Sequence, residues 1–261
     1  MADVLETTVT VRTEPWPRRV RGYLDGQLVV DSRRALMLFE DGHLPVWYFP
    51  PEDVRAELLE PSDKHTQCPY KGTASYSNVR VGDRVVKDAV WNYPDPISGR
   101  EDIAGFMAFY FGKLDSWYEE DDEVFVHPRS PYHRVDVLNS SRHVRIEVDG
   151  ETIAETSRPR LLFETGLPMR CYIHRADVRM ELLEPSDNQT QCPYKGIASY
   201  FSIRVGDQLH EDLVWTYPFP IPECPKIEGL VAFWDERVDV FIDDELQPRP
   251  ESPWARRRRT T

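Results

Sequence analysis

One hexapeptide carries the residue types best suited to chemistry, and the chain contains it twice. Gln67-Cys-Pro-Tyr-Lys-Gly72 recurs as Gln191-Cys-Pro-Tyr-Lys-Gly196. A lysine three residues after a cysteine can lower the pKa of the thiol where the two side chains converge, and the thiolate is then nucleophilic. The alternative is that Cys68 and Cys192 are small buried apolar residues, the usual state of a free cysteine. No histidine is shared by the two copies, so a shared Cys–His catalytic pair is excluded.

Polar residues around the hexapeptide are unusually constant. Residues 57–83 match residues 181–207 at 21 of 27 positions. The identical polar positions of the first copy include Glu60, Asp63, Gln67, Lys71 and Ser75. Core positions exchange similar apolar residues freely, whereas a fold rarely requires a particular Gln or Lys. One interpretation is therefore a shared binding site, and the other is a demanding turn whose backbone is fixed by Pro69 and Gly72.

Aromatic residues are also shared between the copies. Those of the first copy include Tyr48, Tyr70, Tyr76, Trp91 and Tyr93, and their counterparts are Tyr172, Tyr194, Tyr200, Trp215 and Tyr217. Aromatic walls with one cation and a few polar groups are typical of a small-molecule pocket. Packing at the edge of a core, with the hydroxyl or indole N–H bonded to a partner, is the alternative.

Several site types have no counterpart in the sequence. No CxxC knuckle occurs, and Cys171 and Cys224 correspond to Trp47 and Arg100, so we expect no zinc site. The phosphate loops GxxxxGK and GxGxxG are absent. The GxSxG elbow and HExxH are absent as well. The sequence therefore predicts neither a metal nor a cofactor.

These residues belong to a sequence unit that is duplicated within the chain. Residues 18–109 align without gaps with residues 142–233, an offset of 124, and 46 of the 92 positions are identical. The polar stretch Leu138-Asn-Ser-Ser-Arg142 marks the junction. We expect a first repeat domain at 1–139 and a second at 140–261, packed as a pseudo-twofold monomer.

Within each unit the local pattern is mostly β. Val20–Val30 alternates around Asp25-Gly26, which predicts a hairpin. A second hairpin is predicted around Gly82-Asp83, and a third around Gly112-Lys113. One short helix is predicted at Pro51–Leu59, which begins with Pro and acids and is followed by Pro61. The expected fold class is mainly β, with two antiparallel β domains that each contain one short helix.

Composition narrows the function further. The 261 residues include 45 acidic and 32 basic side chains, a net charge of −13, which makes nucleic-acid binding unlikely. The exception considered is the Arg256–Arg259 run. We expect no membrane segment, because no stretch approaches ~18 consecutive apolar residues. We also expect no secretory signal at 1–13, and with four cysteines this favours a cytoplasmic protein with reduced thiols.

The two copies resemble a known family. The pattern Glu-Pro-Ser-Asp-x-x-Thr-x-Cys-Pro-Tyr-Lys-Gly-x-Ala-Ser-Tyr, followed by Val-Trp-x-Tyr-Pro and Ile-x-Gly-x-x-Ala-Phe, is similar to domain of unknown function 427. The resemblance covers nearly the whole chain and implies a β-tent-like fold, two antiparallel sheets pinned at one edge. Some relatives in that class bind zinc through cysteine knuckles, which this chain lacks, and others hold a heterocycle in an aromatic cage. The family is sometimes labelled nucleotidyltransferase, but the Gly-Ser and Asp-x-Asp elements of such enzymes are absent.

Together these features predict a small-molecule binding protein, for a nucleotide-like or heterocyclic ligand, with one aromatic-walled pocket per repeat. The predicted ligand-binding residues are Glu60, Gln67, Cys68, Tyr70, Lys71, Tyr76, Trp91 and Tyr93, with Glu184, Gln191, Cys192, Tyr194, Lys195, Tyr200, Trp215 and Tyr217 in the second repeat. We expect the aromatic residues to form walls, Lys71 to pair with an anionic group, and Glu60 or Gln67 to orient the ligand. The alternatives are an enzyme, either of the nucleotidyltransferase type or with Cys68 or Lys71 as nucleophile, and an interaction scaffold without a small ligand.

Overall fold

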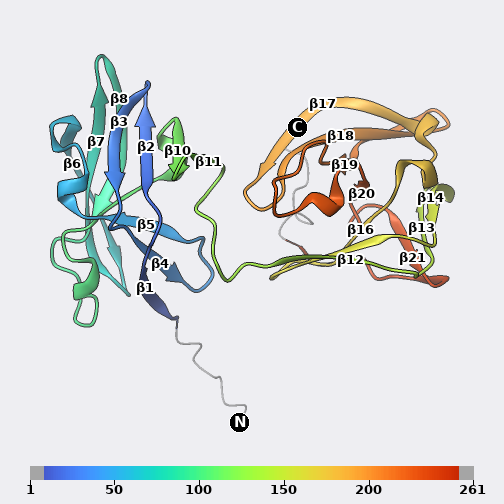
Figure 1. The fold of residues 1–261 in the computed structure, drawn as a ribbon, viewed down its shortest axis with the longest axis horizontal. Helices are drawn as coiled ribbons and strands as arrows, with labels where there is room; N and C mark the ends of the chain where they lie inside the picture. The colour runs from blue at the N-terminus through green and yellow to red at the C-terminus, as the bar shows by residue number, and fades with distance from the viewer. Residues whose placement is uncertain (1–8, 253–261) are drawn as a thin grey trace, which may run out of the picture. The chain divides into compact units, whose positions relative to one another are not determined.

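The computed structural model describes residues 9–252 (Figure 1). Two compact units divide between Ser130 and Pro131. The boundary predicted from the sequence lies after residue 139, but β12 (Val135–Asn139) pairs with β15 (Arg160–Glu164), a strand of the second unit. The Arg256–Arg259 run, considered above for nucleic-acid contact, lies outside the described residues.

The first unit consists of two antiparallel sheets. One has seven strands in the order β1-β4-β5-β9-β8-β7-β6, and the other has four in the order β11-β10-β2-β3. The strands are β1 (Val11–Pro15), β2 (Val20–Leu24), β3 (Gln27–Ser32), β4 (Leu36–Glu40), β5 (Val46–Phe49), β6 (Leu59–Cys68), β7 (Gly72–Val81), β8 (Arg84–Asn92), β9 (Met107–Phe109), β10 (Ser116–Glu119) and β11 (Asp122–Val124). The 3-10 turns are η1 (Pro51–Asp53), η2 (Ala56–Leu58), η3 (Glu101–Ile103) and η4 (Phe111–Lys113).

The second unit repeats this arrangement. Its strands form the orders β12-β15-β16, β17-β18-β19-β20 and β14-β13-β21-β22. The remaining strands are β13 (Val144–Val148), β14 (Glu151–Thr156), β16 (Arg170–Tyr172), β17 (Leu183–Cys192), β18 (Gly196–Val205), β19 (Gln208–Thr216), β20 (Val231–Phe233), β21 (Asp239–Ile242) and β22 (Glu245–Leu246). The 3-10 turns are η5 (Arg175–Asp177), η6 (Met180–Leu182) and η7 (Pro225–Ile227). A bridge between Ile173 and Val231 joins the first two of these sheets, so the seven-strand order of the first unit is reproduced.

The large sheet of each unit buries both of its faces. In the first unit Trp47 and Phe49 of β5 lie in the core formed with the four-stranded sheet, which also contains Trp117. Tyr48, between them on the strand, points to the opposite face because side chains alternate. There it joins a second buried cluster with Tyr76 and Tyr93. The predicted aromatic residues thus gather on the outer face of the large sheet, away from the main core.

Two of the three predicted hairpins are confirmed. β2 pairs with β3 around Asp25-Gly26, and β7 pairs with β8 around Gly82-Asp83. The hairpin predicted around Gly112-Lys113 is wrong. There β9 pairs with β8 in the large sheet, whereas β10 pairs with β2 in the small one. The chain crosses from the large sheet to the small sheet through η4, so Gly112 lies in a connection between two sheets and not in a hairpin turn.

The helix predicted at Pro51–Leu59 is two 3-10 turns, η1 and η2, with extended backbone between them. Val54 forms a bridge with Val30, and the amide of Arg55 donates to the carbonyl of Val29 at 2.9 Å. These bonds hold the middle of the segment against β3, so helical bonds cannot continue through it. The second unit does the same, with Val178 bridged to Ala154.

Candidate functional site

The repeated hexapeptide forms the turn between two long strands. Cys68 ends β6, Gly72 begins β7, and the same turn joins β17 to β18. Gly72 and Gly196 have φ angles of +107° and +109°. In this left-handed region an L side chain is strained. A Cβ at Gly72 would also lie 3.2 Å from the carbonyl oxygen of Asp95. The turn therefore requires glycine, as one of the two interpretations of the shared sequence expected.

We expect Gly72→Ala to destabilise the first unit by about 1–3 kcal/mol, because the methyl group meets backbone atoms and φ is unfavourable. Gly112→Ala is the matched control, since no atom lies within 4 Å of its Cβ position and φ lies outside the left-handed region. Urea unfolding of the full chain measures both changes. Equal stability of the two variants would contradict the requirement for glycine.

The turn directs its lysine inward onto a carboxylate. Lys71 and Lys195 are only 6% and 9% exposed. Lys71 forms an ion pair with Glu40 at the end of β4, and Lys195 pairs with Glu164 at the end of β15, with 2.5 Å between Nζ and Oε2. The glutamates are 124 residues apart, like the lysines. Lys71 is predicted from the sequence to pair with an anionic ligand group, but in each repeat the lysine has a carboxylate of the protein as its partner.

A histidine approaches the same glutamate in both repeats, although the two histidines are not equivalent in sequence. His133 Nε2 lies 2.9 Å from Glu164 Oε1, and its ring stacks on Tyr194 with centroids 4.0 Å apart. His43 Nε2 lies 4.0 Å from Glu40 Oε1. Sequence reasoning missed both glutamates and this convergence. The signal for the glutamates was present, because Leu-Phe-Glu occurs at 38–40 and again at 162–164.

Four of the predicted residues line one cleft in the first unit. The cleft has a volume of about 600 Å³, and these four residues are Lys71, Tyr76, Trp91 and Tyr93. Its other lining residues include Glu40, Val46, Tyr48, Tyr110 and His127. The structure thus brings together most of the expected aromatic wall and the lysine, and adds Tyr110, which has a tryptophan counterpart at 234.

Hydrogen bonds fix the aromatic rings of this cleft. The indole N–H of Trp91 donates to the hydroxyl of Tyr48 at 3.2 Å, and the hydroxyls of Tyr76 and Thr66 are bonded at 2.9 Å. Burial raises the pKa values of Tyr48 and Tyr93, so both hydroxyls stay protonated at neutral pH. Burial, together with a hydrogen bond that the Tyr110 hydroxyl donates to Tyr76, raises the pKa of Tyr110 to about 12. The wall is therefore neutral and preorganised.

The other predicted residues of the first repeat do not line this cleft. Glu60 pairs with Arg80 at 2.5 Å on the surface, and Glu184 pairs likewise with Arg204. Gln67 accepts a hydrogen bond from the Thr73 hydroxyl at 2.7 Å. The remaining positions are surface or packing positions: Tyr70 is 40% exposed, Gln191 is exposed, and Cys68 and Cys192 are half-buried against the aromatic clusters.

In the second unit a side chain of the protein occupies the corresponding place. Arg170, the counterpart of Val46, is buried, and its guanidinium carbon lies 5.7 Å from the ring centroids of both Trp215 and Trp234. It pairs with Asp235 at 3.2 Å and with Glu236 at 2.5 Å. Burial raises the pKa of Asp235 to about 6 despite the nearby cation. The predicted residues Lys195, Tyr200, Trp215 and Tyr217 are all buried, and Trp215 is the one in contact with Arg170.

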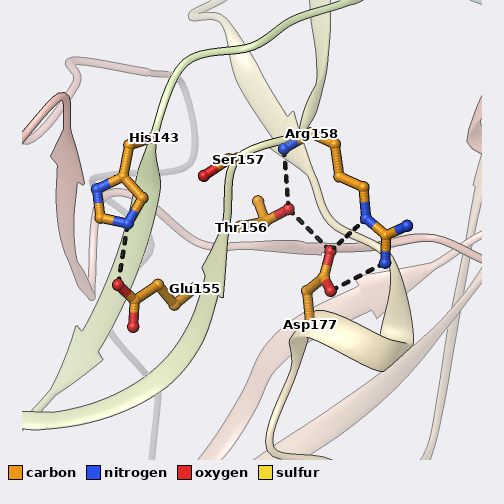
Figure 2. Close-up of a pocket in the computed structure, with 6 residues that line it drawn as sticks. All are labelled: His143, Glu155, Thr156, Ser157, Arg158 and Asp177. Atoms are coloured by element: carbon orange, nitrogen blue, oxygen red, sulfur yellow. Dashed lines mark hydrogen bonds and ion pairs between the residues drawn. The ribbon is translucent and has the colours of Figure 1, made fainter.

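The second unit also has a polar pocket of about 390 Å³, and the side chains that line it form hydrogen bonds and ion pairs with one another (Figure 2). His143 lies 2.9 Å from Glu155, while Thr156 and Arg158 both donate to Asp177. In the first unit, Ser32 and Arg34 donate to Asp53 in the same arrangement. In both repeats these hydrogen bonds connect the end of β3 or β14 to the 3-10 turn η1 or η5, so we assign them a structural role.

No group of three or more His, Cys, Asp or Glu side chains within residues 9–252 is arranged to hold a metal ion. In the same part of the chain, no helix has the length and apolar character needed to cross a membrane. Burial raises the pKa of the Cys171 thiol to about 12 and that of Cys224 to about 11, so neither is a reactive thiolate at neutral pH.

A sequence model of one family matches both repeats. The family is described as a domain of unknown function, DUF427, and the matched residues are 12–120 and 136–244. No curated protein matches the chain. The matched segments contain both Lys–Glu pairs and the aromatic walls, whereas the part of the cleft formed by residues 126–128 lies outside them.

Proposed function

The chain belongs to the family described as domain of unknown function 427, in two tandem copies, and we propose that its first repeat binds a small planar organic molecule in the aromatic cleft. The family description assigns no activity, so the proposal depends on the geometry of the site. The observation that carries it is the cleft of about 600 Å³ between Trp91, Tyr110 and the Lys71–Glu40 pair.

The size and lining of the cleft support this proposal. Ligand pockets are typically about 300–1,000 Å³, mainly aromatic or apolar, with a few fixed polar groups. Trp91 and Tyr110 lie with ring centroids 4.7 Å apart at an interplanar angle of 47°, and Tyr76 stacks on Tyr110 at 6.5 Å. Lys71 and Glu40 place a hydrogen-bond donor beside an acceptor. A flat ring with polar atoms at its edge fits such walls and such a pair.

The two repeats differ in this respect, so we propose one binding site rather than one per repeat. In the second repeat, Arg170 fills the space beside Trp215 and Trp234 and is held by two carboxylates. The first repeat has Val46 at that position. The second repeat then serves as a packed counterpart whose aromatic residues are structural.

We also propose that the protein is cytoplasmic and that its partner is a small molecule rather than nucleic acid. All four cysteines lie in the described part of the chain and are free thiols, as in proteins of reducing compartments. The net charge of −13 opposes binding to phosphate backbones. Cell fractionation with a tagged full chain tests the location.

We expect a fragment that binds the cleft to lose about tenfold or more in affinity in Tyr110→Ala, because the variant removes one stacking face. Tyr70→Ala is the matched control: Tyr70 is 40% exposed and Tyr110 39%, but Tyr70 does not line the cleft. Thermal-shift screening of the full chain with nucleobases, nucleotides and aromatic fragments identifies binders, since saturation at 100 times Kd adds about 2.7 kcal/mol. Titrations of both variants follow. Binding that is unchanged in Tyr110→Ala, or no binder in the whole panel, would overturn the proposal.

A further inference from the structure

The second repeat contains a side chain that occupies its aromatic site as a ligand would. The guanidinium group of Arg170 lies 5.7 Å from both tryptophan rings, Trp215 and Trp234. These rings have centroids 4.9 Å apart and an interplanar angle of 53°. A planar cation on ring faces is favoured by the negative potential of the π-system. Trp215 of β19 and Trp234, which follows β20, therefore bind a guanidinium group in this structure.

The first repeat keeps a matching pair of rings but lacks the arginine. Trp91 and Tyr110 are the counterparts of the two tryptophans, and their separation of 4.7 Å and angle of 47° reproduce the geometry. Val46 replaces Arg170 at the same register position, opposite Leu38 as Arg170 is opposite Leu162. Val46, Trp91 and Tyr110 all line the open cleft. The short side chain leaves free the space that the guanidinium group fills in the other repeat.

From this comparison we infer that the ligand of the first repeat carries a planar, delocalised cation of the amidinium or guanidinium class, placed where Arg170 lies in the second repeat. The inference rests on the proposed function, and it specifies the ligand class of that cleft.

Cations already lie on neighbouring ring faces of the first repeat. Lys64 Nζ is 4.3 Å from the centroid of Tyr76, and Lys113 Nζ is 5.0 Å from that of Tyr110. Both ammonium groups are held from outside the cleft: Lys64 lies 3.7 Å from Asp88, and Lys113 donates to the carbonyls of Lys87 and Asp88. The rings of Tyr76 and Tyr110 thus already form cation–π contacts with lysines that do not line the cleft.

The chemistry of the cleft favours a delocalised cation over an ammonium group. Asp235 and Glu236, which neutralise Arg170, are replaced by Phe111 and Gly112. Among the residues that line the cleft, Glu40 is the one acid, and it is shared with Lys71. With one shared carboxylate the ligand is held mainly by ring faces. A guanidinium or amidinium group is more weakly hydrated than an ammonium group and stacks flat on such faces.

Three probes of matched size test the inference on the full chain: benzamidinium, neutral benzamide and anionic benzoate. We expect benzamidinium to bind about tenfold more tightly than benzamide, within the range measured for cation–π contacts, and benzoate to bind most weakly. Ligand-observed NMR titration at physiological salt gives the three affinities. Tyr70→Ala should leave them unchanged, and Tyr110→Ala should weaken benzamidinium binding.

Val46→Arg supplies the first repeat with the arginine of the second. We expect it to abolish benzamidinium binding, because the variant fills the cleft while leaving the acidic surface intact and so also controls for nonspecific attraction of cations. Retained binding in a folded Val46→Arg protein would overturn the inference. If that variant does not fold, the comparison of the three probes on the unmodified chain still decides the question.

The remaining outcomes separate the two proposals. If benzamide or benzoate binds as tightly as benzamidinium and depends on Tyr110, the cationic class is wrong while the cleft remains a binding site. If none of the three probes binds but another fragment does, the cationic ligand class is again wrong, while the proposed binding function still stands. If no compound of any class binds the cleft, the proposed function fails with it.

Discussion

Replacing Arg170 with alanine is expected to destabilise the second unit by about 3–5 kcal/mol, the usual range when one member of a buried ion-pair network is removed. Arg170 is 7% exposed, and the side chains of Asp235 and Glu236 are 13% and 5% exposed. Without the guanidinium group, two neighbouring carboxylates stay buried without a cation. Urea unfolding of the full chain, followed by tryptophan fluorescence, measures the change.

The loss of stability in Arg170→Ala should depend on pH. In the native protein burial already raises the pKa of Asp235 to about 6, above its unfolded value, so this group disfavours the folded state increasingly as pH rises toward 6. Removing the cation raises the folded-state pKa of Asp235 further, and it also removes the hydrogen bond from Arg170 that helps to hold the pKa of Glu236 below its usual value. The difference from the native protein should therefore be large at pH 8 and smaller at pH 5. Arg249→Ala is the control, since the side chains of Arg249 and its partner Asp239 are 59% and 44% exposed and the loss of this pair should change little. A deficit that does not vary with pH would contradict this account.

Lys71→Met is expected to destabilise the first unit by about 3–5 kcal/mol, because Glu40 is left buried without its partner. The side chains of Lys71 and Glu40 are 8% and 12% exposed. Restoring charge balance with Lys71→Met/Glu40→Leu should recover most of the loss, since a buried ion pair can often be replaced by apolar residues at little net cost. The measurement is again urea unfolding.

Lys64→Met is the matched control for the buried lysine. Its ammonium group is 3.7 Å from Asp88 and its side chain is 39% exposed. Solvent screens such a pair, so little stability should be lost. If Lys71→Met behaved like Lys64→Met, the Lys71–Glu40 contact would be an ordinary surface pair. If the double variant were no better than Lys71→Met, the pair would be required for more than charge balance.

Duplication made much of the fold predictable, and it also explains what was missed in the site. Comparing the two copies identified residues that both retain, and these include Lys71, Trp91 and the glycine of the turn. Glu40 was equally shared, but within an apolar strand it gave no sign of its partner 31 residues away. Arg170 was overlooked for the opposite reason. It differs from Val46, and a search for identities cannot detect a side chain that makes the two sites unlike each other.

Local patterns predicted strands better than they predicted connections. Asp25-Gly26 and Gly82-Asp83 mark hairpins because the turn and both strands are local in sequence. The segment at Pro51–Leu59 has the signals of a helix start, yet the bridge from Val54 to Val30 decides its backbone. The pairing of β10 with β2, across most of the unit, likewise overrides the Gly112-Lys113 turn signal. Such nonlocal bonds cannot be read from a window of neighbouring residues.

The position of β6 at the end of the large sheet has a consequence for solubility. β6 and β17 are ten-residue strands with one side unpaired in their sheets, and such strands invite pairing with other chains. Each carries a proline, Pro61 or Pro185, that removes a donor, and an irregularity in register follows directly. The exposed acids Asp63 and Asp187 add like charges along the same edge. The shared Glu-Pro-Ser-Asp sequence can thus be understood as protection against aggregation, independent of any ligand.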